Sequence, residues 1–132
     1  MCRSRLCTMD PNARLIIGQR VGMSAVTITS HELIEIGDDT QIGAGTVIID
    51  SDFHSISPDA TRRHNELGPT SPVHIGRNVF IGTRCLILKG ITIGDNAVIG
   101  AGSVVTKNIP NNAIAAGNPI RIIRQLDQTM GN

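Results

Sequence analysis

Residues 75–105 read IGRNVFIGTRCLILKGITIGDNAVIGAGSVV, and this stretch decides the fold. An aliphatic residue recurs every six positions, and a glycine directly follows most of the isoleucines. The recurring aliphatic residues are Ile75, Ile81, Ile87, Ile93, Ile99 and Val105. A helical period does not produce this spacing, and simple alternation does not explain the glycines. Each six-residue unit therefore fits a short strand followed by a turn.

The same six-residue spacing occurs earlier in the chain, at Ile36, Ile42 and Ile48. Three such units make one triangular coil of 18 residues, the length of segments 36–53, 75–92 and 93–110. Stacked coils pair each strand with the strands above and below it, and each coil is stable only through its neighbours. The sequence therefore predicts an all-β fold, a parallel β-helix with an aliphatic column inside.

The spacing also divides the chain, which at 132 residues is long enough for one domain. Three prolines and two adjacent arginines interrupt the units over 55–74, which indicates a loop expelled from the coil, either functional or a tolerated surface insertion. After Pro119, the helix-like spacing of Ile120, Ile123 and Leu126 predicts a C-terminal helix that covers the last coil. We expect a single domain over 1–132, with an irregular N-terminus (1–14), first coils (15–53), the loop (55–74), last coils (75–116) and the helix (119–129).

Composition limits the function. A net charge of +1 gives no general reason to expect nucleic-acid binding. No apolar run approaches the roughly 20 residues that span a bilayer, and the N-terminal residues lack the apolar segment of a signal peptide. The three cysteines lack metal-binding spacing, which favours reduced thiols in the cytoplasm, with Cys85 as a small buried filler.

One histidine stands where the spacing breaks. The position after Ile48 in the six-residue series is His54, and the loop begins directly behind it. A histidine can take up a proton near neutral pH, so His54 offers a general base at the mouth of the loop. A structural histidine is the alternative interpretation.

The run from SPVHIGRNVFIGTRCLILKGITIGDNAVIGAGSVVTKNIP to AAGNPIRIIR, residues 71–124, resembles the hexapeptide-repeat acyltransferases. This family includes maltose, galactoside and nodulation-factor O-acetyltransferases. The resemblance alone implies a left-handed coil, because the general rule for parallel crossovers favours the right hand. It also implies an acetyltransferase that takes acetyl-CoA as donor and a sugar or glycan hydroxyl as acceptor. Members usually form homotrimers with active sites between subunits.

The resemblance also assigns catalytic roles. The family's catalytic histidine matches His54, which would deprotonate the acceptor as it attacks the thioester of acetyl-CoA. Asp50, Asp52 and Glu66 are candidates to orient the imidazole or the acceptor, or are simple loop charges. The family's oxyanion donor is a backbone N–H at the place of Thr83.

The cofactor residues follow from the same match. The pantetheine arm of coenzyme A would hydrogen-bond to the backbone at Thr83 and Ala101, and Phe80 would flank it or pack outward. Lys107, Arg121 and Arg124 match positions that meet the nucleotide phosphates, and the two arginines would share one face of the helix. Ordinary surface charge is the alternative for the arginines.

The chain departs from the sugar acetyltransferases at the acceptor side: Gly45 stands where they often carry asparagine, and their longer acidic N-terminal segment is missing, so we expect a truncated or divergent N-terminus. Two other functions compete. A zinc lyase of the γ-carbonic anhydrase type needs three histidine ligands, including a close pair, and His31, His54, His64 and His74 provide no such pair. No metal is therefore expected. A non-catalytic β-helix serving as an assembly module is the second alternative.

Overall fold

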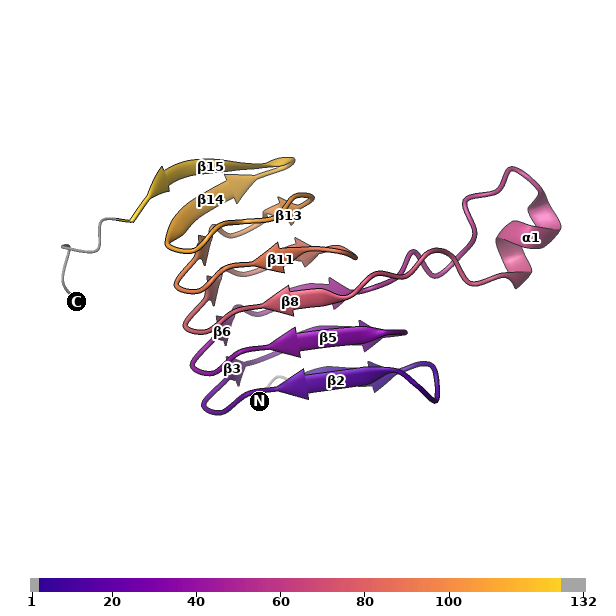
Figure 1. Ribbon diagram of the computed structural model, residues 1–132, viewed down its shortest axis with the longest axis horizontal. Helices are drawn as coiled ribbons and strands as arrows, with labels where there is room; N and C mark the ends of the chain where they lie inside the picture. Colours follow the sequence, from indigo (N-terminus) through magenta and orange to yellow (C-terminus); the bar gives the residue numbers. More distant parts are fainter. Residues whose placement is uncertain (1–2, 127–132) are drawn as a thin grey trace.

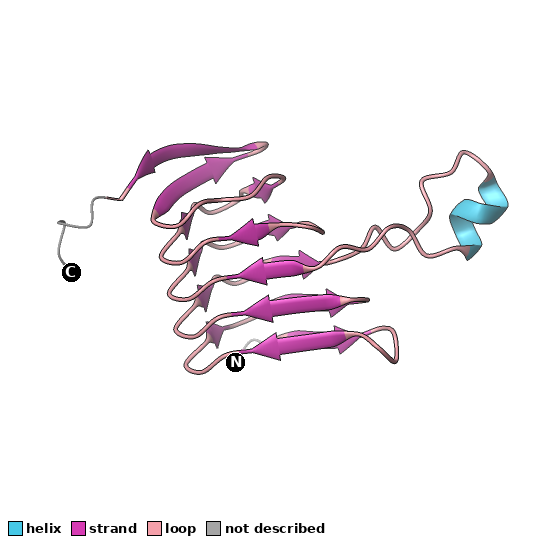
Figure 2. Ribbon diagram, viewed as in Figure 1, coloured by secondary structure: helices cyan, strands magenta, loops and turns pink. Residues whose placement is uncertain are grey.

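The computed structural model describes residues 3–126. The chain winds upward as a parallel β-helix with a triangular cross-section, and a loop carrying α1 (Ala60–Asn65) projects from one edge (Figures 1 and 2). Within the described residues α1 is the only helix, and none is long and apolar enough to cross a membrane. The predicted coil and expelled loop are both present.

Three sheets form the sides of the prism, and successive strands pass from one sheet to the next; the last coil adds no strand to sheet B and two strands to sheet C. Sheet A contains β1 (Arg5–Thr8), β4 (Thr27–Ser30), β7 (Val47–Ile49), β10 (Leu86–Ile87) and β13 (Val104–Val105). Sheet B contains β2 (Arg14–Ile17), β5 (Leu33–Ile36), β8 (Val73–Ile75) and β11 (Thr92–Ile93). Sheet C contains β3 (Gly22–Met23), β6 (Gln41–Ile42), β9 (Phe80–Ile81), β12 (Val98–Ile99), β14 (Ala113–Gly117) and β15 (Ile120–Gln125).

The strand register confirms the six-residue unit. Phe80 lies opposite Val98 in sheet C, and Leu86 lies opposite Val104 in sheet A, so residues 18 apart are stacked. Across the loop the pairing continues without a slip, with Ile36 opposite Ile75. The predicted aliphatic positions are buried and form a continuous internal column, which stabilises each coil through its neighbours.

Neighbouring coils approach most closely at the turns, where glycine is required for space. A Cβ added to Gly43 would lie 2.6 Å from the backbone nitrogen of Thr83, and one added to Gly82 would lie 2.6 Å from the backbone nitrogen of Ala101. No side chain fits at such distances. The Ile-Gly pairs of the sequence therefore combine an inward anchor with a turn that admits the next coil.

The turns between sheets B and C carry a ladder of asparagines. Asn78, Asn96 and Asn112 adopt positive φ angles of 53°, 63° and 61°, a conformation that asparagine tolerates better than most residues. The side-chain amide of Asn78 donates to Asn96 (3.0 Å), and that of Asn96 donates to Asn112 (2.9 Å). The ladder links three successive turns.

Asp50 is fully buried where β7 leaves sheet A, and its carboxylate fixes the turn of the coil below. One oxygen accepts the hydroxyl of Ser30 (2.8 Å) and the backbone N–H groups of Glu32 (2.9 Å) and Leu33 (2.8 Å). The other oxygen accepts the N–H of His31 at 2.7 Å. A carboxylate is acceptor-only, so it suits a turn in which several donors converge.

The loop leaves the coil through a neck of two antiparallel strands of chain. Asp52 donates its N–H to the Pro69 carbonyl at 3.1 Å, and Ser71 donates to the Asp50 carbonyl at 2.9 Å. Gly68 packs against this neck, since an added Cβ would lie 2.0 Å from the carbonyl oxygen of His54. Beyond the neck, α1 lies at the far end of the loop (Figure 1).

Both ends of the coil differ from the sequence prediction. The predicted helix over 119–129 is wrong for residues 120–125, which form β15 and pair antiparallel with β14, while residues 127–129 lie outside the described residues. The free edge of β14 supplies hydrogen-bond partners that a helix would leave unused. The expected irregular N-terminus instead contains β1, paired in parallel with β4.

We predict that Gly43→Ala destabilises the coil by about 3 kcal/mol, because the methyl group collides with backbone that cannot move independently of its coil. Thermal unfolding monitored by circular dichroism measures the effect. Gly22→Ala is the matched control: there the nearest atoms belong to the flexible end of the Gln41 side chain. Equal melting temperatures for the two variants would contradict the close-approach explanation.

We also predict that Asp50→Asn lowers the unfolding free energy by about 2–4 kcal/mol, because an amide N–H₂ would face backbone donors. Asp10→Asn provides the comparison, since Asp10 is exposed and accepts one N–H, that of Asn12. Chemical denaturation of both variants gives the difference. A loss at Asp50 no larger than the loss at Asp10 would show that the buried hydrogen bonds contribute little.

Candidate functional site

His54 lies in the neck of the loop, with its side chain exposed. The sequence suggested that it takes the inward position after Ile48, but that position belongs to Ile75, which stacks on Ile36. The turn from β4 to β5 in the coil below holds extra residues: Ile28 and Ile36, both inward in consecutive strands, are eight apart, whereas Ile87 and Ile93 in the coil above are six apart. Counting by six therefore fails in the lower coils at this edge of the prism, and His54 lies outside the inward series, in the neck of the loop.

The imidazole of His54 has a defined hydrogen bond. Its Nδ1 lies 2.9 Å from the backbone carbonyl of Arg63 at the end of α1. A carbonyl only accepts, so Nδ1 carries the hydrogen and the neutral ring has its lone pair on Nε2. The loop thus fixes the tautomer that a general base needs, with backbone in the role that a carboxylate fills in many enzymes.

No hydrogen bond or ion pair joins the three candidate carboxylates to this ring. Asp50 is buried and engaged at the turn below. Asp52 forms an ion pair with Lys89 at 3.1 Å, and Glu66 pairs with Arg62 at 3.2 Å, one helical turn apart. Asp52 lies in the neck, and Glu66 lies where the chain returns from α1 to the neck. Both ion pairs are partly exposed to solvent.

A second group of predicted site residues lies on the outer face of sheet C. On this face Val98 lies above Phe80, and Ile114 of β14 lies above Val98. Arg124 lies opposite Ile114, and residues directly opposite in an antiparallel pair share a face. Arg121 is likewise opposite Ala116, and Phe80 is 57% exposed. The two arginines share the face of a strand, where the sequence had predicted the face of a helix.

Thr83 and Ala101 occupy the turns from sheet C to sheet A, one directly above the other. The carbonyl of Thr83 accepts the N–H of Gly102 at 2.8 Å. None of the hydrogen bonds within residues 3–126 uses the N–H of Thr83 or of Ala101, and both residues are exposed. This edge therefore offers backbone donors to a ligand. Behind it, burial raises the pKa of the Cys85 thiol, whose sulfur contacts the Gly100 carbonyl (3.2 Å).

Lys107 is exposed and follows β13, at the turn after sheet A. It therefore shares an edge of the prism with the neck and His54, whereas Thr83 and Ala101 lie on the opposite edge of sheet A. Within one chain the structure brings the predicted residues together as two groups, one on each side of sheet A.

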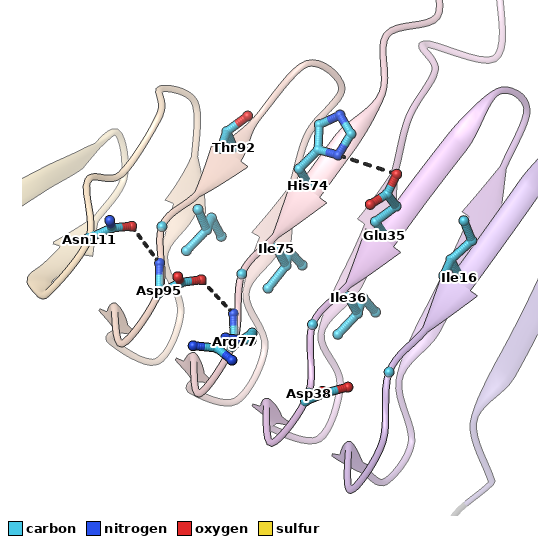
Figure 3. Close-up of a pocket in the computed structure, with 15 residues that line it drawn as sticks. Ile16, Glu35, Ile36, Asp38, His74, Ile75, Arg77, Thr92, Asp95 and Asn111 are labelled. Atoms are coloured by element: carbon cyan, nitrogen blue, oxygen red, sulfur yellow. Dashed lines mark hydrogen bonds and ion pairs between the residues drawn. The ribbon is translucent and has the colours of Figure 1, made fainter.

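A hollow of about 510 Å³ lies elsewhere, on the outer face of sheet B (Figure 3). Glycines of successive turns line it, and the cross-strand pair Glu35–His74 (3.8 Å) lies on the same face. Asp95 there accepts the N–H of Arg77 at 2.8 Å. The hollow contains none of the predicted site residues, which lie at the loop, at the edges of sheet A and on the outer face of sheet C.

The sequence did not indicate a role beside the neck for three further residues. Arg63 contributes through its carbonyl, which no side-chain pattern reveals. Lys89, the partner of Asp52, lies one coil above the neck. His31 contacts both Ser51 and Phe53. As for the zinc alternative, no three His, Cys, Asp or Glu side chains among residues 3–126 are grouped as a metal site would require.

Comparison with known proteins identifies the family. Residues 72–107 match the profile of the "Hexapeptide repeat of succinyl-transferase" family. The galactoside O-acetyltransferase of Escherichia coli (strain K12) is 43% identical over 102 residues, 77% of this chain and 49% of that protein. The chain therefore spans about half the length of this curated relative.

Solved structures agree over nearly the whole chain. A galactoside acetyltransferase in complex with coenzyme A superposes with a TM-score of 0.79, at 36% identity, covering 94% of this chain and 60% of that one. A maltose O-acetyltransferase from Clostridium difficile 630 gives 0.74 at 35% identity, covering 96% and 70%. These superpositions confirm the left-handed parallel β-helix, and the chain belongs to the hexapeptide-repeat acyltransferase family.

Proposed function

We propose that this protein is a coenzyme A-dependent acetyltransferase that moves the acetyl group of acetyl-CoA to a hydroxyl of a sugar or glycan, with His54 as general base. The observation that carries the proposal is the hydrogen bond from His54 Nδ1 to the Arg63 carbonyl, which leaves Nε2 unprotonated on an exposed ring. The names of the related proteins, galactoside and maltose O-acetyltransferases, support the donor and the class of acceptor.

The proposed reaction is a direct transfer. Nε2 of His54 takes the proton of the acceptor hydroxyl while the oxygen attacks the thioester carbon. The tetrahedral intermediate collapses by breaking the carbon–sulfur bond, and the imidazolium returns its proton to the leaving thiolate. Acetate ester and free coenzyme A are the products, and no covalent enzyme intermediate or metal takes part.

The backbone N–H of Thr83 is proposed as the donor that stabilises the oxyanion of this intermediate. Its support is the absence of any hydrogen bond to that N–H within the described chain. The backbone N–H of Ala101, one coil above, likewise makes no hydrogen bond within the described chain. The two N–H groups lie along one edge of the coil, which suits the long, thin pantetheine arm.

Two arginines and an aromatic ring lie on the outer face of sheet C, beside the edge that carries Thr83. Arg121 and Arg124 share the outer face of sheet C with Phe80, so we propose that they bind the phosphates of coenzyme A while Phe80 flanks the cofactor. Lys107 contributes from the other edge of sheet A. For the acceptor, we propose that the exposed carboxylates of Asp52 and Glu66 accept hydrogen bonds from sugar hydroxyls beside His54.

A single site that contains both groups of residues would draw them from two copies of the chain. The outer face of sheet A is apolar and half-buried over β7, β10 and β13, with Val47, Ile49, Leu86, Leu88 and Val104. Below them, Thr27 and Thr29 of β4 make the same face polar. If three copies pack these faces around a threefold axis, the edge with Thr83 of one copy meets the edge with His54 of the next. We therefore propose a homotrimer with active sites between subunits, acting in the cytoplasm, where the free thiols of Cys7 and Cys85 remain reduced.

We predict that His54→Ala lowers kcat by about 10²–10⁴-fold, because no other group takes the acceptor's proton, while affinity for acetyl-CoA stays unchanged. Release of free thiol from acetyl-CoA with a panel of sugars measures transfer, and calorimetry measures cofactor binding. His64→Ala, an exposed histidine on α1, is the matched control and should retain full activity. Cofactor binding without transfer to any acceptor in the wild type would favour a non-catalytic module.

We predict that Leu86→Glu dissociates the trimer and abolishes transfer, because it buries a charge on the apolar outer face of sheet A. Light scattering gives the mass, and circular dichroism verifies that the coil is intact. Thr92→Glu places the same charge at the corresponding outward position of sheet B and should leave the trimer and its activity unchanged. A trimeric Leu86→Glu variant would rule out this face as the interface.

A further inference from the structure

The backbone that presents His54 is strained. The N–H of His54 donates to the carbonyl of Asp52 at 2.6 Å, closing a three-residue turn centred on Phe53. Phe53 has a φ of +64°, so this is a γ-turn of the rare kind with a positive central φ. Such a conformation is uncommon for a bulky residue and persists only where the surroundings hold it.

His31, at the turn between β4 and β5 in the coil below, makes one contact with this γ-turn and one with the residue that precedes it. Its ring meets the Phe53 ring edge-on, with centroids 5.0 Å apart and planes at 86°. Its Nδ1 lies 2.9 Å from the hydroxyl oxygen of Ser51, and the same oxygen accepts the N–H of Phe53 at 3.3 Å. The side chain and the N–H of the central residue are therefore both held, directly or through the buried Ser51, by one histidine.

The position of His31 is itself fixed by the buried carboxylate of Asp50, which accepts its N–H at 2.7 Å. Contacts thus run from the coil to the imidazole: Asp50 holds His31, His31 holds Phe53 and Ser51, and Phe53 sets the direction in which His54 leaves the neck. On the outer side, the Arg63 carbonyl holds Nδ1 of His54. The ring of His54 is fixed from both sides.

We propose that His31 is a positioning residue: it braces the strained γ-turn at Phe53 and so aims the imidazole of His54. This inference deepens the proposed function and rests on it, since His54 matters as a base only if acyl transfer occurs. Displacement of a catalytic group by about 1 Å can cost on the order of 10²-fold in rate. Without the brace, relaxation of Phe53 toward ordinary φ values would rotate His54 away from the Arg63 carbonyl.

The test compares His31→Ala with His74→Ala, a histidine of similar exposure on the outer face of sheet B. We expect His31→Ala to lower kcat about 10- to 100-fold, with both KM values within about twofold of the wild type and an unchanged cofactor affinity. His74→Ala should match the wild type. If His31→Ala proves too unstable to measure, His31→Asn keeps a polar atom near Ser51 without the ring contact, and the same loss of kcat is expected.

Repeating the His31→Ala substitution in a Phe53→Gly protein distinguishes bracing of the γ-turn from a direct role of His31 in the reaction. Glycine adopts positive φ freely, so in Phe53→Gly the turn needs no brace and His31→Ala should cost less than about threefold. An equal loss in both backgrounds would overturn the proposal. A raised KM for the acceptor with unchanged kcat would also overturn it, because that result assigns His31 to acceptor contact.

Nitrogen NMR of the histidine rings tests the brace without activity. The wild type should show His54 as a single tautomer with the hydrogen on Nδ1, and His31→Ala should show a mixture of both tautomers. Identical ring-nitrogen shifts in the two proteins would overturn the proposal. If the wild type transfers no acetyl group, the proposed function fails, while the tautomer comparison still decides whether His31 positions His54.

Discussion

The structure depends on one distance, the spacing at which stacked coils hydrogen-bond through their backbones. Strands meet at about 4.8 Å wherever they pair, and a continuous helix of strands must keep that spacing through its turns as well. At Gly43 and Gly82 the neighbouring backbones leave no room for a side chain. The aliphatic column inside is possible only because the turns permit this approach. The glycines let the turns of neighbouring coils approach, and the isoleucines fill the interior that this spacing encloses.

A coil of constant cross-section repeats the same faces and edges from one level to the next, and this determines where chemistry can occur. Polar groups for a reaction must come from a turn that departs from the repeat, or from the edge of a second coil. Here the turn after β7 departs, and Asp50 and His31 anchor the departing chain to the regular coil. The proposed cofactor groups around Thr83 lie across sheet A from that neck, so the proposed site would be completed only by a second copy of the chain.

The periodic part of the fold could be predicted because its physical cause recurs: every unit from Ile75 to Val105 buries the same position. The ends could not, because Ile120 and Ile123 suit the face of a helix as well as a strand, and the open edge of β14 decided between them. In the candidate site, residue type pointed to His54 and missed its partner, since the Arg63 carbonyl leaves no mark in the sequence. Asp50 was a candidate because of its charge, whereas its buried carboxylate accepts the hydrogen bonds of a turn.

The reversed strand at the top bears on polymerisation. A stack of equivalent parallel coils could in principle continue from one molecule into the next, as a fibre, if the three strand edges at the top of one copy matched the three at the bottom of another. Because β15 turns back along β14, sheet C extends above the last strands of sheets A and B and ends in a strand of opposite direction. The three strand edges at the top of one copy therefore no longer match the three at the bottom of another. A single antiparallel strand of six residues thus opposes end-to-end stacking of the coils.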